Sequence, residues 1–174
     1  QKTLYQNYQV VVIDNASDDA KTLAYLETLP HQVLRISNRG DAFSYAYVNN
    51  EAVKQVDTDY VLFLNDDTEV THSQWLSQMV GYAQLSGVGV VGARLLYPDG
   101  RVQHAGVVHG LHNGLAGHAF KLNAAWDFGY LGYANVLRNY SAVTAACMLT
   151  KCSLFKELGG FDELSFAVAY NDVD

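Results

Sequence analysis

Apolar and polar residues alternate along the chain in a way that predicts short strands separated by helices. Runs rich in β-branched or other apolar residues predict strands at residues 9–15, 33–36 and 61–64. Apolar residues at helical spacing predict amphipathic helices at residues 20–29, 41–55 and 73–85. Strands that alternate with helices of this length are typical of an α/β protein with a mainly parallel sheet flanked by helices.

The pattern changes after the third predicted helix. Two apolar runs at residues 87–97 and 101–108 are joined by a proline-aspartate-glycine turn, which predicts a small antiparallel hairpin. A further strand is expected at residues 141–149. A short helix is expected at residues 151–158, where two glycines end it.

Two acidic residues follow the most apolar of the strands. An uninterrupted apolar run such as residues 61–64 predicts a strand that is covered on both faces of a parallel sheet. Ligands of such sheets bind outside the carboxyl ends of the strands. There, the carboxylates of Asp66 and Asp67 could hold Mg²⁺ or a similar cation together with a substrate phosphate. The same residues are good turn formers, and by themselves they favour a turn over a metal site.

Composition limits the kind of protein. A chain of 174 residues, of which 49% are hydrophobic and 17% charged, fits one globular domain. The formal net charge of −7 argues against nucleic acid as a partner, because such a partner requires a basic surface. Cys147 and Cys152 match no disulfide or zinc pattern and are expected as reduced core residues. We find no signal peptide and no apolar run of about 18 residues, so no segment is expected to span a membrane.

Several motifs resemble those of the family 2 glycosyltransferases with the GT-A fold. They are Leu64-Asn65-Asp66-Asp67-Thr68-Glu69, Gly159-Gly160-Phe161-Asp162-Glu163 and Asn171-Asp172-Val173-Asp174. Residues 139–147 resemble the bacterial branch that builds O-antigen, capsule and related cell-surface glycans. The resemblance extends over nearly the whole chain and implies a single, Rossmann-like GT-A domain at residues 1–174. Family members begin with an earlier strand and helix, and this chain finishes inside a motif. We therefore expect a longer protein, with the first strand and the C-terminal part absent from this sequence.

The resemblance implies a nucleotide-sugar site at the strand ends. In the family an aspartate-asparagine pair lies against the nucleotide base, which favours Asp14 and Asn15 for base recognition. Spacing alone fits a helix N-cap equally well. Family members also carry an asparagine near the donor in the second helix, and Asn50 is the candidate. The alternative for Asn50 is a buried side chain that satisfies a neighbouring backbone group.

The predicted metal site departs from the family's usual sequence. Family members commonly have Asp-x-Asp or three consecutive acids, whereas Asn65 comes first here. Asp67 is therefore the expected direct ligand of Mn²⁺ or Mg²⁺. Asp66 is expected as a second ligand or as a contact to the ribose.

The resemblance also implies the reaction. A metal-dependent enzyme of this kind moves a hexosyl or deoxyhexosyl group from a nucleotide-diphosphate sugar to a hydroxyl of a glycan or lipid-linked acceptor, with inversion at the anomeric carbon. Asp172 is the expected catalytic base, because an acid begins this motif in the family, and Asp174 is the second candidate. The expected location is the cytoplasm, with peripheral association of the full-length protein at the inner face of the membrane.

Three further features do not point to a single chemistry. The run Gly87-Val88-Gly89-Val90-Val91-Gly92 matches a dinucleotide-binding motif, but it lies inside an apolar run and not between a strand and a helix. Four histidines in or beside a glycine-rich segment match no usual zinc spacing: His104, His109, His112 and His118. The aromatic residues that follow, such as Trp126 and Phe128, suit either a loop that closes on a sugar or core packing.

Two other functions stay open. A non-catalytic nucleotide- or sugar-binding module on the same fold is compatible with Asn65 in place of an acid. A sugar nucleotidyltransferase would share the α/β layout and the metal. It would need a glycine- and arginine-rich phosphate loop near its start, and this sequence shows none.

Overall fold

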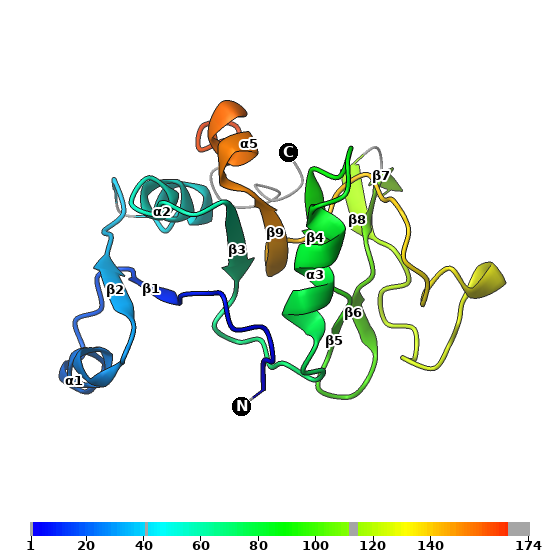
Figure 1. Ribbon diagram of the computed structural model, residues 1–174, viewed down its shortest axis with the longest axis horizontal. Coiled ribbons are helices and arrows are strands. Elements are labelled where there is room, and N and C mark those ends of the chain that lie inside the picture. Colours follow the sequence, from blue (N-terminus) through cyan, green and yellow to red (C-terminus); the bar gives the residue numbers. More distant parts are fainter. Residues whose placement is uncertain (1, 41, 112–114, 167–174) are drawn as a thin grey trace.

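The computed structural model describes residues 2–40, 42–111 and 115–166, and its elements lie in three groups (Figure 1). The first group holds β1 (Val11–Asp14), α1 (Ala20–Thr28), β2 (Gln32–Arg35) and α2 (Tyr45–Val53). The central group holds β3 (Tyr60–Leu64), α3 (Trp75–Ala83), β4 (Val90–Gly92), β9 (Cys147–Lys151) and α5 (Cys152–Glu157). The third group holds β5 (Leu95–Leu96), β6 (Val102–His104), β7 (Val107–Gly110), β8 (Leu115–His118) and the 3₁₀ turn η1 (Tyr130–Gly132).

The first group is a strand-helix-strand-helix unit. β1 and β2 pair in parallel, as a connecting helix requires. Asp19 caps α1, since its Oδ2 accepts a hydrogen bond from Thr22 N at 2.8 Å. Ser44 caps α2 in the same way, which explains why this helix begins at Tyr45, later than the sequence predicts.

The central sheet has β9 in its middle. β9 runs antiparallel to β3 on one side and to β4 on the other, so β3 and β4 run in the same direction without touching. The sequence predicts β3 to be covered on both faces. Phe63 is indeed buried, but Leu64 at the end of the strand is 46% exposed, because the strand leaves the core there and enters a turn.

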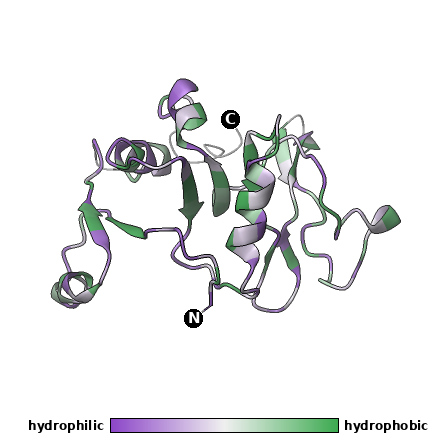
Figure 2. Ribbon diagram, viewed as in Figure 1, coloured by the Kyte–Doolittle hydropathy of each residue, from purple (hydrophilic) through white to green (hydrophobic). Residues whose placement is uncertain are grey.

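Two packed clusters hold the central sheet. On one side, the rings of Phe63, Phe155 and Phe161 lie with centroids 5.0 to 5.1 Å apart, within the distance at which aromatic rings stabilise one another. On the other side, the apolar face of α3 packs on β4 and β9, as its spacing predicts. Figure 2 shows the hydrophobic colour along β3 and β9. No helix in the described ranges has the length and apolar content of a membrane span.

The third group consists of hairpins. β5 and β6 form the predicted antiparallel hairpin, and β7 and β8 form a second. Residues 141–142 bond to Val107 of β7 instead of to the central sheet, which explains why β9 begins later than predicted. This close approach requires Gly106, whose φ is +114° and whose added Cβ would lie 2.2 Å from a ring carbon of Tyr140.

The glycine-rich run at residues 87–92 leads into β4, and further strand follows it. The structure therefore supports the prediction that this run is not a dinucleotide-binding motif, because no helix begins after it to receive a pyrophosphate.

Candidate functional site

An acidic turn ends β3. Thr68 N and Thr68 Oγ1 both donate to Asn65 O, at 3.3 and 2.7 Å, and Asn65 N donates to Ala146 O at 3.0 Å. The turn that the composition favours is therefore present. Asp66 and Asp67 are the exposed residues at its tip.

Neither carboxylate of the turn forms a hydrogen bond or ion pair with another side chain in the described ranges. Asp66 and Asp67 are thus adjacent like charges at the carboxyl end of a strand, which is the donor set that a hard divalent cation prefers. Among the residues that the structure describes, no three acidic, histidine or cysteine side chains are grouped to hold one metal. The two acids fit Mn²⁺ or Mg²⁺ whose other ligands are water and phosphate.

Asp14, at the end of β1, has a partner within the protein for each of its carboxylate oxygens. Its side chain is buried: Oδ1 accepts from Ser17 N at 3.0 Å and Oδ2 lies 3.2 Å from Arg35 Nη1. Hydrogen bonds from Ser17 lower the pKa of Asp14, and the charge of Arg35 adds to this against the effect of burial. Asp14 does not cap α1, because Asp19 does so. The carboxylate shapes the loop after β1.

Asn15 links the ends of β1 and β2. Its Nδ2 donates to Ile36 O at 2.8 Å, and it exchanges side-chain hydrogen bonds of 3.2 and 3.4 Å with Asn38. Asn38 Oδ1 also accepts from Ser44 N, so the pair fixes the start of α2. Sequence analysis missed Asn38 and Arg35. Arg35 had a detectable signal, since it lies opposite Asp14 in the parallel register.

The side-chain amide of Asn50 makes its hydrogen bonds within the protein. It is 7% exposed; its Oδ1 accepts from Phe161 N, and its Nδ2 donates to Phe161 O and to Glu163 Oε1, all at 2.9 Å. The structure thus shows the alternative that the sequence left open, a buried asparagine that satisfies backbone. A direct contact of Asn50 with the donor stays a prediction.

The loop of the Gly-Gly-Phe-Asp motif is clamped to the first group. Glu163 accepts from Asn50 on one oxygen and from Arg39 Nη1 at 3.2 Å on the other. Arg39 also lies over the ring of Tyr47 at 4.5 Å. Asp162 turns the chain by accepting from Leu164 N and Ser165 N. Hydrogen bonds from the side chain and backbone of Ser165, and then from the backbone of Leu164, lower the pKa of Asp162.

A cavity of about 310 Å³ opens beside the acidic turn. Leu64 and Thr68 line it on the side of the turn, Trp75 and Tyr82 on the side of α3, and Arg94 on the side of β4. The walls combine apolar and aromatic side chains with a few polar groups, as is typical of ligand pockets.

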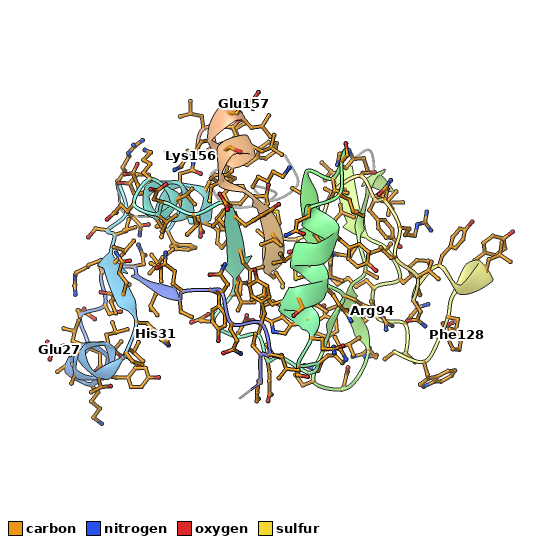
Figure 3. The ribbon with its side chains drawn as sticks, viewed as in Figure 1. Glu27, His31, Arg94, Phe128, Lys156 and Glu157 are labelled. Atoms are coloured by element: carbon orange, nitrogen blue, oxygen red, sulfur yellow. The ribbon has the colours of Figure 1, made fainter. Side chains whose placement is uncertain are left out.

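The four histidines do not form one cluster among the described residues, and the aromatic loop is exposed. His104 and His118 meet, His109 is exposed on β7, and His112 lies outside the described residues. The aromatic side chains of the following loop do not form a core: Trp126 is 80% exposed and Phe128 67%. Figure 3 shows Phe128 near the end of the molecule opposite α1. Their contact with a sugar stays a prediction.

Asp172 and Asp174 also lie outside the described residues, so their catalytic roles stay predictions. No hydrogen bond or ion pair in the described ranges joins the Asp14 cluster to the acidic turn. Cys147 and Cys152 are buried and unpaired with each other, as expected, and burial raises the pKa of the Cys147 thiol to about 11.

Comparison with known proteins identifies the class. The sequence profile of Glycosyl transferase family 2 matches residues 1–159. The chain belongs to this family, and the predicted resemblance and the GT-A class of α/β fold are confirmed. The solved structure of the mannosyltransferase PcManGT from Pyrobaculum calidifontis, in complex with GDP-Man and Mn²⁺, has the same fold. It aligns with a TM-score of 0.61 over 99% of this chain and 43% of its own, at 20% identity.

Two curated relatives are more similar in sequence. The uncharacterized protein y4gI of Sinorhizobium fredii is 45% identical over 99% of this chain. The O-antigen biosynthesis protein RfbC of Myxococcus xanthus is 40% identical, also over 99% of this chain. The chain spans only 19% and 14% of the lengths of these two relatives.

Proposed function

We propose that the chain forms part of a single GT-A domain of an inverting glycosyltransferase that depends on Mn²⁺ or Mg²⁺. Its donor is a nucleotide-diphosphate sugar. Its acceptor is a hydroxyl of a glycan or lipid-linked intermediate in the synthesis of O-antigen or a related surface polysaccharide. The observation that carries the proposal is the exposed acid pair Asp66 and Asp67 on a fixed turn, in a chain that belongs to family 2.

In this proposal the acidic turn holds the donor's diphosphate through the cation. Asp67 would be the direct ligand, and Asp66 a second ligand or the contact to the ribose. When bound, the ion would supply positive charge to the leaving diphosphate, whose negative charge increases in the transition state. The chain's own contribution is a turn that keeps both carboxylates exposed, with no partner for either among the residues that the structure describes.

The nucleotide base is proposed to lie against the ends of β1 and β2. Asp14 and Asn15 are already engaged with Ser17, Arg35 and Asn38. We therefore assign them a shaping role in base recognition, in which they hold the loop backbone that faces the base. Asn50 would act in a similar way, by holding the loop at residues 161–163.

Asp172, with Asp174 as the second candidate, is proposed as the base that takes the proton from the acceptor hydroxyl. The cavity beside the turn is the proposed approach of the acceptor, because Leu64 and Thr68 belong both to its wall and to the end of β3 that carries the acids. Attack from the side opposite the diphosphate would invert the anomeric carbon. Peripheral association with the membrane is proposed for the full-length protein, where the acceptor is lipid-linked. The 40% identity to RfbC supports the class of acceptor.

A non-catalytic donor-binding module is the second candidate. The observation that favours it is Asn65, which gives the site one carboxylate fewer than three consecutive acids would. The family match does not support the third possibility, a nucleotidyltransferase.

The test is calorimetric titration of the chain with UDP, GDP and dTDP, with and without Mn²⁺. We expect one of them to bind, only with the metal, and Asp67→Asn to weaken this binding at least about tenfold. Asp57→Asn, the loss of another exposed acid, is the matched control and should bind as the wild type does. Metal-independent binding, or binding that survives Asp67→Asn, would contradict the proposed site. Sugar transfer by the full-length protein then separates the enzyme from the binding module.

A further inference from the structure

A pair of histidines lies in the third group, on β6 and β8. His104 at the end of β6 is 1% exposed, and its Nδ1 lies 2.8 Å from Nδ1 of His118 at the end of β8. The two rings meet edge to face, with centroids 5.1 Å apart. Val102 and Val107, which lie close to His104 in the chain, are also buried.

The hydrogen bonds assign the protons of this pair. Thr144 N donates to His104 Nε2 at 3.4 Å, so this nitrogen carries no proton. The ring of His104 is therefore neutral, with its proton on Nδ1. His104 Nδ1 then donates to His118 Nδ1, which must be unprotonated at that atom. Each ring has a defined role, and an apolar side chain in place of either would remove a hydrogen bond from this series.

The pair connects to the acidic turn through residues 144–146. Beyond the His104 contact, Thr144 Oγ1 accepts from Ala146 N at 3.4 Å. Ala146 O in turn accepts from Asn65 N at 3.0 Å, and Asn65 O holds the side chain of Thr68. A continuous series of hydrogen bonds thus runs from His118 to the turn that carries Asp66 and Asp67.

We infer that His104 and His118 are positioning residues that set the place of segment 144–146, and through it the acidic turn. His104 joins β6 of the third group to segment 144–146, which leads into β9 and bonds to Asn65 just after β3. The expected effect of the histidine pair on metal and nucleotide binding rests on the proposed function. The series of hydrogen bonds from His118 to the acidic turn does not depend on that function.

Side-chain geometry supplies matched variants. Glutamine places its amide oxygen near the position of histidine Nε2, so His104→Gln keeps the acceptor for Thr144 N. Asparagine matches only the Nδ1 position, so His104→Asn loses that acceptor. At the other residue, His118→Asn keeps an acceptor for His104, whereas His118→Leu removes it. His109→Asn, at an exposed histidine on β7, is the control.

The experiment has two readouts, recorded at the same interval below each variant's melting temperature. Amide NMR shifts of Asn65 and Ala146 report the structural connection. Calorimetric titration with Mn²⁺ and the nucleotide that the wild type binds reports the site. We expect His104→Asn and His118→Leu to shift both amides and to weaken binding about 10- to 100-fold, as loss of supporting contacts does at metal sites. We expect His118→Asn and His109→Asn to stay within about threefold, because the supporting contacts remain. His104→Gln keeps the acceptor for Thr144 N but loses the donor to His118, so it should weaken binding less than His104→Asn does.

The possible failures are distinguishable. If His104→Asn and His118→Leu fold and bind like the wild type, with unchanged amides, the inference is wrong and the proposed function stands. If glutamine and asparagine at position 104 weaken binding equally, the Thr144 contact is not the connection, which also overturns it. A wild-type chain that binds no nucleotide would contradict the proposed function and, with it, the role of the pair in binding.

Discussion

Two regions use polar residues in opposite ways. One is the acidic turn at the end of β3. The other is the junction where Asn50 of α2 holds the loop at residues 161–163. At the junction, Asn50 makes three hydrogen bonds of 2.9 Å and has almost no contact with solvent. At the turn, Asp66 and Asp67 are exposed and make none with other described side chains. Both were candidates for donor binding on sequence grounds. The structure distinguishes them, because the side chain of Asn50 already makes its hydrogen bonds within the protein, whereas those of Asp66 and Asp67 make none with other described side chains.

This difference indicates what substitutions should do. A polar group whose hydrogen bonds are already made within the protein contributes to stability, and its loss leaves buried partners unsatisfied. A charged group without partners contributes little to stability and is available for a ligand. The junction should therefore respond in unfolding experiments, and the turn in binding experiments.

The largest effect is expected at the junction's glycine. A Cβ at Gly160 would lie 2.4 Å from Asn50 Oδ1, and φ there is +81°. We expect Gly160→Ala to lower the free energy of unfolding by about 3 kcal/mol, from backbone strain plus overpacking. Gly159→Ala is the matched control, because φ is +88° but nothing lies within 4 Å, and it should cost only about 1 kcal/mol. Urea unfolding measures both, and equal losses would mean that the contact with Asn50 is unimportant.

Asn50→Ala should come next. It removes the partners of Phe161 N and O, and we expect a loss of about 2 to 3 kcal/mol in the same unfolding measurement. Asn49→Ala tests the neighbouring asparagine, whose side chain, among the described residues, donates only to Tyr45 O within its own helix. The loss should stay within about 1 kcal/mol. A stable Asn50→Ala that has lost nucleotide binding would instead favour the direct donor contact.

Substitution of the turn should reverse this behaviour. Asp67→Asn should change the free energy of unfolding by no more than about 0.5 kcal/mol, because its side chain is exposed. It should weaken Mn²⁺-dependent nucleotide binding at least about tenfold, which corresponds to about 1.4 kcal/mol. Asp66→Asn should weaken it less, since Asp67 is the proposed direct ligand. The opposite order in calorimetry would exchange the roles of the two acids.

The smallest effect concerns acid stability. The pKa of Asp14 is lowered in the folded protein, so its carboxylate stabilises the fold above the ordinary aspartate pKa of about 4. That contribution is lost as the pH falls through the lowered pKa. Asp14→Asn should therefore have a free energy of unfolding about 1 kcal/mol below that of the wild type at pH 7, and thus a lower melting temperature. The difference between the two proteins should narrow below about pH 4. Melting curves from pH 7 to 3 test this, with Asp57→Asn as the control for the loss of one charge. If the stability difference between Asp14→Asn and the wild type stays constant over this pH range, the charge of Asp14 is not the source of its contribution to stability.

Local features of the fold were predictable because they depend on neighbouring residues. The spacing of apolar residues located α1 and α3, and the acidic turn followed from a strand that ends in turn-forming residues. The polar task of Asn50 was also visible as an asparagine inside a helix. Its partner was not, because Phe161 lies 111 residues away and no local signal couples the two.

Features that depend on distant contacts were missed for the same reason. The meeting of His104 and His118 requires two hairpins to pack, which a spacing of 14 residues does not specify. The aromatic loop has the composition of a core segment, yet Trp126 and Phe128 remain exposed, and apolar content alone cannot distinguish these outcomes. The place of β9 between β3 and β4 is likewise a matter of topology.

That place of β9 has a consequence for synthesis on the ribosome. β3 and β4 are made early, but each pairs only with β9 among the described strands, and Tyr60 lies opposite Lys151. A nascent chain that ends before β9 has two apolar strands with free edges, and such edges invite association with other chains. The parallel pair of β1 and β2 can close as soon as residue 35 has emerged. We therefore expect the growing chain to need protection from aggregation from about the time β3 leaves the exit tunnel until β9 follows it.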